Sequence, residues 1–331
     1  MAEPNAPLMN DEIEIDPNML KDLTAESYDS TGYNTETTSL ASSICKYTFE
    51  NGRRYHSYYG PNKSYLPTDE TEQERLDMHH EILVQTLSGK LFLAPLDTPQ
   101  RILDIGTGTG IWAIDCADIY PSAEVVGTDI SPIQPGWVPP NVKFEVDDAE
   151  KDWTFQPDSF DYVHSRNLAQ SIENWPKLLS QCYQVTKPGG YVELAELSLQ
   201  LNSDDNTNGP ALLKWMNLVQ EACDKIGRPG VTEDILRSRL EDAGFVDVVV
   251  QTFKQPYGPW AKDERNKKIG AMTILAAEAG TEGYGMALFT RILGMSSEEA
   301  KEICKAAVKD LRNKNYHSYS PYIVVYGRKP E

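Results

Sequence analysis

The sequence predicts an α/β protein with a mostly parallel sheet, and three features of its middle part carry this prediction. Short apolar strands alternate with helical segments between residues 99 and 200. A glycine-rich loop follows the first strand and opens a helix, and Lys187-Pro188-Gly189-Gly190 ends a later helix. Strands and helices that alternate at this spacing form parallel sheets with right-handed crossovers. The expected strands are 101–105, 124–128, 143–146, 160–164 and 191–199, and the expected helices are 111–119 and 175–186.

The remainder of the chain is predicted to complete this sheet. Two helices are expected at 209–227 and 232–243, followed by a strand at 246–252. A returning strand at 322–328 predicts an antiparallel edge pair. Between these two strands lies a helical insertion, residues 256–316, with expected helices at 262–280, 284–293 and 296–313. The predicted domain that contains this sheet and the insertion spans residues 99–331.

The first 98 residues divide into two segments of different character. Residues 1–49 are rich in acidic and small polar residues and predict a disordered tail, apart from a short helix expected within 37–49. Residues 50–98 contain a tyrosine-rich stretch, interpreted as too irregular for a strand, and then a helix capped by Thr68 that runs to about Leu93. This second segment is expected to cover the cofactor site.

Composition excludes several classes of function. The 331 residues carry a formal net charge of −19, which is unsuited to a nucleic-acid-binding surface. The sequence has no apolar run long enough to cross a membrane and no secretory signal, so a cytoplasmic location is expected. The five cysteines are widely spaced without a C-x-x-C pair, which argues against a disulfide framework and against a metal site.

The glycine-rich loop has the pattern Asp104-Ile-Gly-Thr-Gly-Thr-Gly110 and includes Gly106, Thr107 and Gly108. Glycines allow a tight turn and a close approach of the backbone to a ligand. The dinucleotide fingerprint would place a third glycine where Ile111 stands, and no Lys-Ser/Thr pair follows for a phosphate loop. Asp104 would repel a pyrophosphate but accept a hydrogen bond from an ammonium group. The loop therefore favours a nucleoside that carries an amino acid.

Further acids end the next two strands. Asp129 follows the second strand, where a carboxylate accepts hydrogen bonds from both hydroxyls of a ribose. Asp148 and Ala149 follow the third strand, where a carboxylate accepts from an adenine amino group. Together with the glycine loop, these acids predict a site for a nucleoside cofactor.

The segment ILDIGTGTGIWAIDCADIYPSAEVVGTDISPIQPGWVPPNVKFEVDDAE, with the flanking DSFDYVHSRNL and NWPKLLSQCYQVTKPGGYVE, resembles the class I S-adenosylmethionine-dependent methyltransferases. More narrowly, it is similar to the fungal LaeA-like group. The resemblance implies a seven-stranded Rossmann-like sheet with an antiparallel terminal strand and helical caps, S-adenosyl-L-methionine as cofactor, and no metal. It also implies that Asp104 and residues 106–110 face the methionine end and that Asp129 holds the ribose. Asp148 would then hold the adenine amine, and Ile130 would lie against the adenine or simply end a strand.

Three histidines are candidates for a general base, which methyl transfer needs only when the acceptor arrives protonated. His164 ends the fourth strand, at the edge where open α/β sheets bind ligands, and it is alternatively a polar strand-end residue without a chemical role. His79 and His80 lie on the helix that precedes the sheet, so one is expected to face the site and the other the solvent.

Two functions remain open at this stage. In the first, the chain methylates an oxygen or nitrogen of a small molecule in fungal secondary metabolism, and aromatic and methionine residues of the insertion line the acceptor pocket. The candidates are Phe253, Tyr257, Trp260, Met272, Tyr284, Met286, Phe289 and Met295. In the second, the chain is a LaeA-like nuclear regulator that acts through protein partners. The absence of a run of Lys and Arg for nuclear import favours the enzyme.

Overall fold

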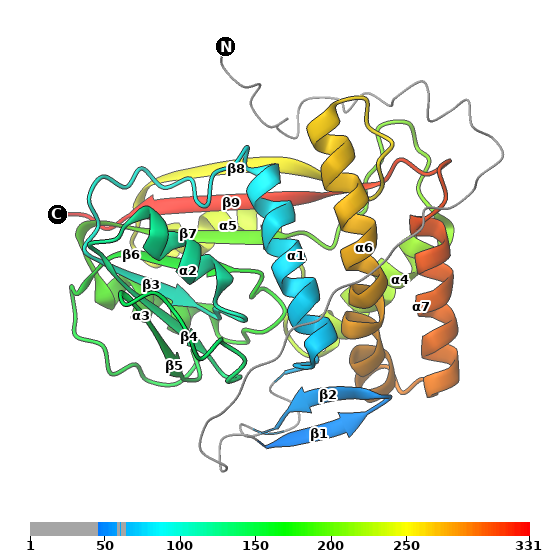
Figure 1. Cartoon of the computed structure of the whole chain (residues 1–331), viewed down its shortest axis with the longest axis horizontal. Coiled ribbons are helices and arrows are strands. Elements are labelled where there is room, and N and C mark those ends of the chain that lie inside the picture. The colour runs from blue at the N-terminus through cyan, green and yellow to red at the C-terminus, as the bar shows by residue number, and fades with distance from the viewer. Residues whose placement is uncertain (1–45, 58–59, 61–63) are drawn as a thin grey trace.

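The computed structural model describes residues 46–57, 60 and 64–331, and the expected disordered tail lies outside these residues except for its last few positions. The main sheet has seven strands in the order β5-β4-β3-β6-β7-β9-β8 (Figure 1). Strand β9 is antiparallel to both of its neighbours, and the other pairs are parallel. The strands are β3 (Arg101–Ile105), β4 (Glu124–Asp129), β5 (Val142–Val146), β6 (Phe160–Arg166), β7 (Thr186–Leu197), β8 (Val246–Pro256) and β9 (Tyr319–Arg328). The predicted mostly parallel seven-stranded fold with an antiparallel terminal strand is therefore confirmed.

Helices cover both faces of this sheet. On one face, α3 (Trp175–Val185) and α5 (Glu233–Asp242) bury Leu178, Leu179, Leu236 and Leu240 against the strands. On the other face lie α1 (Glu70–Thr86) and α2 (Ile111–Ile119), which bury Leu83 and Trp112 respectively. Helices α3 and α5 present apolar side chains to the sheet, whereas the buried residues of α1 include charged and polar side chains as well.

A second hydrophobic core lies beside the sheet, where the remaining helices pack on one another (Figure 1). It is formed by α4 (Pro210–Lys225), α6 (Glu264–Ala287), the π-helical turn η1 (Leu288–Ile292) and α7 (Ser297–Leu311). The sequence predicted a break in the α6 region between residues 280 and 284. Instead, α6 is continuous and contains four glycines. These glycines lie where neighbouring groups approach the helix closely.

The structure corrects two expectations about the segment before the sheet. The tyrosine-rich stretch, interpreted as too irregular for a strand, forms a hairpin of β1 (Tyr47–Glu50) and β2 (Arg53–His56). The short helix expected within 37–49 is likewise replaced by β1 over its described residues. The first long helix begins after Asp69, whose side chain accepts a hydrogen bond from the Glu72 backbone N–H, and it ends at Thr86.

A buried ion pair within α1 lies against α6. Glu72 and Arg75 are 1% and 6% exposed, and two hydrogen bonds of 3.0 and 2.7 Å connect the guanidinium to the carboxylate. A Cβ atom at Gly283 would lie 3.2 Å from the Glu72 carboxylate, and one at Gly280 would lie 3.2 Å from Arg75 Cδ. The glycines of α6 therefore make room for the long charged side chains of α1.

We expect Glu72→Ala to lower the free energy of unfolding by about 3–5 kcal/mol, because it leaves the Arg75 guanidinium buried without its counter-ion. The matched control is Glu302→Ala, which removes the same i,i+3 arrangement from the exposed Glu302–Lys305 pair. That control should change stability by less than about 1 kcal/mol. Urea denaturation of both variants gives the comparison, and equal losses would show that the buried pair has no special role.

Candidate functional site

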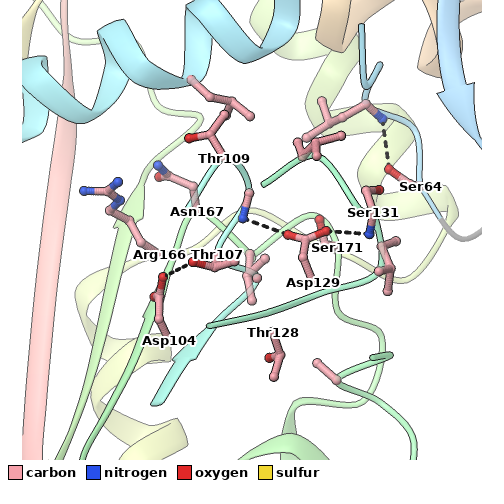
Figure 2. Close-up of a pocket in the computed structure, with 18 of the residues that line it drawn as sticks. Ser64, Asp104, Thr107, Thr109, Thr128, Asp129, Ser131, Arg166, Asn167 and Ser171 are labelled. Atoms are coloured by element: carbon pink, nitrogen blue, oxygen red, sulfur yellow. Dashed lines mark hydrogen bonds between the residues drawn. The ribbon is translucent and has the colours of Figure 1, made fainter. Parts of the chain in front are cut away.

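A cavity opens at the carboxyl edge of the parallel strands, where β3, β4 and β6 end and α1 passes above them (Figure 2). Every residue predicted for the cofactor lines it except Gly110, the last residue of the loop, which caps α2. All three candidate histidines line it as well. Residues that sequence reasoning did not assign also contribute, among them Ser64, Leu76 and Ser171. No local motif marks these positions, because they reach the cavity through the packing of distant segments.

The glycine loop adopts a backbone that only glycine tolerates well. Gly106, Gly108 and Gly110 have φ values of 67°, 59° and 83°. A Cβ at Gly110 would lie 2.3 Å from the Phe144 ring, and one at Gly106 would lie 2.5 Å from Leu168. At Gly108 the nearest atom is 3.7 Å away, on Leu76. The loop therefore leaves an open backbone cradle at Gly108.

Asp129 lies at the end of β4 beside this cradle. Its carboxylate accepts hydrogen bonds of 2.8 Å from the backbone N–H of Gly108 and of 2.8 Å from that of Ser131 (Figure 2). Burial raises the pKa of Asp129 to about 6, in spite of these two hydrogen bonds. The carboxylate is therefore fixed in position at the cavity wall and still ionised at neutral pH.

Asp104 is more deeply enclosed than the sequence suggested. Thr107 donates to it over 2.6 Å, and His164 Nδ1 lies 2.7 Å from its other oxygen. The His164 ring stacks on the Trp112 indole with centroids 3.7 Å apart, and the side chain is only 1% exposed. Burial lowers the pKa of His164, which opposes the effect of the neighbouring carboxylate. The main contact of His164 is therefore with Asp104, and it fixes the orientation of that carboxylate.

The far end of the cavity combines an acid with apolar side chains. Asp148 is 3% exposed and accepts a hydrogen bond of 3.0 Å from the Glu150 backbone N–H. Ala149 and Ile130 line the same end, with Leu168 across from the glycine loop. A buried carboxylate among apolar groups suits a flat ring with a polar amino edge.

His79 and His80 differ in their partners. His80 Nδ1 accepts a hydrogen bond of 3.0 Å from Arg166, so its Nε2 carries the proton that it donates to Asp115 over 2.9 Å. His79 has no hydrogen-bond partner among the described residues. Burial and the positive charges of Arg75 and Arg166 hold the pKa of His79 well below its ordinary value. His79 is therefore a neutral imidazole, and no residue in the described part of the chain forms a hydrogen bond with it.

A second cavity adjoins the first, and the two share His79, Asn167 and Tyr284 in their walls. Of the eight aromatic and methionine residues proposed for an acceptor pocket, Tyr257 and Tyr284 line this second cavity. Met286 and Phe289 are instead buried in the second core, where Phe289 packs edge-on against Trp215. Met286 of α6 and Phe289 of η1 pack against α4 and α7 and line neither cavity, so the structure does not place them in the pocket.

Within the described residues, no group of three or more His, Cys, Asp or Glu side chains is arranged to hold a metal ion. Over the same residues, none of the helices combines the length and apolar character needed to span a bilayer.

Comparison with known proteins places this geometry in a family. A family model described as "Methyltransferase domain" matches residues 78–250, which is more than half of the chain. "Methyltransferase pytC" of Aspergillus terreus is 39% identical over 319 residues, covering 95% of this chain and 97% of that protein. "Secondary metabolism regulator laeA" of Aspergillus fumigatus is 36% identical, covering 85% and 76%. "Protein-methionine methyltransferase laeA" of Emericella nidulans is 34% identical with the same coverage.

Among solved structures, phosphoethanolamine N-methyltransferase 2 of Haemonchus contortus in complex with S-adenosyl-L-methionine aligns with a TM-score of 0.44 and 21% identity. That alignment covers 82% of this chain and 55% of the other. The residues matched by the family model include β3 to β7 and the loops at the carboxyl ends of the parallel strands. The chain therefore belongs to the methyltransferase family.

Proposed function

We propose that the chain transfers a methyl group from S-adenosyl-L-methionine to an oxygen or nitrogen of a small molecule in fungal secondary metabolism. The observation that carries this proposal is the shared wall of the two cavities, where the neutral His79 lies between the predicted donor site and a second cavity. The pytC relative, similar over nearly the whole chain, supports a role for the chain as an enzyme.

The residues of the first cavity fit the cofactor. The open cradle at Gly108 admits a ligand against the backbone, and the fixed carboxylate of Asp129 beside it suits a ribose diol. Asp148 and Ala149 would hold the adenine edge, with Ile130 against its face. Asp104, Gly106, Thr107 and the rest of the loop would face the methionine end. When bound, the cofactor supplies an electrophilic methyl group at its sulfonium.

The chain's own contribution to transfer is alignment, exclusion of water and removal of a proton. Helix α1 covers the carboxyl edge (Figure 1). Thr109 of the glycine loop donates a hydrogen bond of 2.6 Å to Asp77 of α1, which connects the helix to the loop. Alignment of two bound reactants supplies much of the rate of such a displacement. Of the three histidines, His79 is the one whose ring is held by no described partner, so we assign it the base role ahead of His164 and His80.

The regulator names of the laeA relatives favour a second function. In this alternative the chain acts in the nucleus through protein partners, and the acceptor is a protein. Incubation of the purified chain with isotopically labelled S-adenosyl-L-methionine and fractions of a fungal extract separates the two. Label in a small molecule supports the enzyme of secondary metabolism, and label confined to protein supports the alternative.

Binding of S-adenosylhomocysteine is expected to weaken about tenfold between pH 7.5 and pH 5. Asp129 has a pKa raised to about 6, so at pH 5 roughly nine-tenths of the carboxylate is protonated and accepts hydrogen bonds poorly. Calorimetric titration at several pH values measures the effect. Asp129→Asn should bind more weakly at pH 7.5 and lose this pH dependence. A variant that retains the pH profile of the parent would assign the titration to another group.

We expect His79→Ala to lower label incorporation by about a hundredfold or more, because general-base catalysis contributes about that much. The affinity for S-adenosylhomocysteine should stay within about threefold, since the donor is held by the glycine loop and the strand-end acids. His80→Gln is the matched control on the same helix, and it should have the smaller effect on turnover. Equal turnover in His79→Ala and the parent would remove His79 from the chemistry.

A further inference from the structure

The second cavity lies between α1, α4, α6 and the end of β8. Its wall is mostly apolar, with Leu212, Trp215 and Met216 from α4, Ala276 and Ala277 from α6, and Tyr257 just after β8. Its volume is about 120 Å³. An apolar cavity of about 150 Å³ is large enough to admit benzene. The cavity is thus suited to an apolar group of about one aromatic ring.

The charges around this cavity cancel. Among the described residues of its wall there is no carboxylate and no lysine, and its one guanidinium is that of Arg75. Arg75 already makes two hydrogen bonds to Glu72 and lies over the Tyr284 ring, 5.4 Å from its centroid. His79 is held neutral. A charged ligand would therefore lose its hydration without meeting an unpaired counter-ion, at a cost of several kcal/mol.

Two amide groups in the wall have unused hydrogen-bonding capacity. Gln255 Oε1 and Gln170 Nε2 are buried and have no hydrogen-bond partner among the described residues. Both residues line the second cavity. An orphaned buried polar atom costs stability, so its retention points to a ligand group that completes it. One acceptor atom and one donor atom would recognise a hydroxyl or carbonyl on an otherwise apolar molecule.

The geometry points to this cavity as the methyl-acceptor site, selective for uncharged, ring-sized apolar molecules with a hydroxyl group. This inference rests on the proposed function for its link to methyl transfer, because the cavity meets the donor site at His79, Asn167 and Tyr284. Arg75 and Glu72 act as positioning residues that keep the wall neutral. Gln170 and Gln255 would be determinants of acceptor specificity.

Three phenols whose para substituents are neutral, negatively charged and positively charged test the selectivity of the cavity for uncharged molecules. The full chain is titrated by calorimetry with 4-ethylphenol, 4-hydroxyphenylacetate and tyramine, in the presence and absence of saturating S-adenosylhomocysteine. We expect 4-ethylphenol to bind with a dissociation constant of about 1 mM or less, and both charged analogues to bind at least about tenfold more weakly. Absence of 4-ethylphenol binding up to about 5 mM, or equal binding of a charged analogue, overturns the inference.

A cavity-filling variant locates the binding. Ala277→Phe places a ring in the second cavity and should weaken 4-ethylphenol binding at least about tenfold, with S-adenosylhomocysteine affinity unchanged. Leu275→Phe is the matched control, an exposed position of the same helix outside the cavity wall, and it should bind like the parent. Unchanged phenol binding in Ala277→Phe overturns the assignment of the cavity. If Ala277→Phe fails to fold, the ligand series on the parent chain still decides the selectivity.

The two proposals fail in different ways. If the parent chain does not bind S-adenosylhomocysteine, the proposed donor site is wrong. The titration of the phenols without that ligand still tests the second cavity. Normal S-adenosylhomocysteine binding with no preference for the uncharged phenol leaves the donor site intact and removes only the acceptor inference.

Discussion

The buried ion pair of Glu72 and Arg75 is the contact on which the arrangement of both cavities depends. It lies where α1 crosses α6, and it is completed by the Tyr284 ring against the guanidinium. A pair of this kind contributes little net stability compared with apolar packing, but removal of one partner is costly. Its effect here is geometric. The pair occupies the space that Gly280 and Gly283 leave on α6, so α1 lies close to α6, and residues of α1 line both cavities.

The same contact explains features of α6 that are unfavourable for a helix taken alone. Glycine inside a helix costs roughly 1 kcal/mol relative to alanine, and α6 has four. Gly280 and Gly283 admit the side chains of Arg75 and Glu72, and a Cβ at Gly270 would overlap the backbone of Gly258. These three glycines therefore lower the helix propensity of α6 but allow neighbouring groups to pack closely against it. Because α6 stays continuous, Tyr284 reaches the boundary between the cavities.

Much of the fold could be predicted from the sequence, because the signals for it are local. The strand β3 and the helix α2 have the predicted bounds, and apolar runs followed by Asp104 and Asp129 marked the strand ends. The hairpin β1–β2 was missed although Asn51-Gly52, with φ values of 53° and 80°, is a strong turn signal. Similarly, Asp69 rather than Thr68 caps α1, because Asp69 also pairs with Arg53 of the hairpin.

The second cavity could not be predicted in this way. Its wall joins α1 to α4, β8 and α6, which begin more than a hundred residues after α1 ends, and no short motif specifies which face of α6 turns inward. Of the aromatic residues expected to line an acceptor pocket, Tyr257 and Tyr284 line this cavity, whereas Phe289 is fully buried in the second core. Apolar side chains at irregular spacing do not distinguish a pocket wall from a core, since both bury the same residue types.

The low basicity of His79 is consistent with an acceptor that enters the second cavity uncharged. An imidazole with a depressed pKa removes a proton from a free hydroxyl only poorly. The proton of the acceptor oxygen becomes far more acidic as that oxygen acquires a methyl group, so a weak base suffices when proton removal accompanies transfer. A more basic histidine at this position would become protonated and place a positive charge beside Arg75 and Arg166. The positive charges of Arg75 and Arg166 beside His79 therefore explain both why its imidazole stays neutral and why it would be a weak base where the two cavities meet.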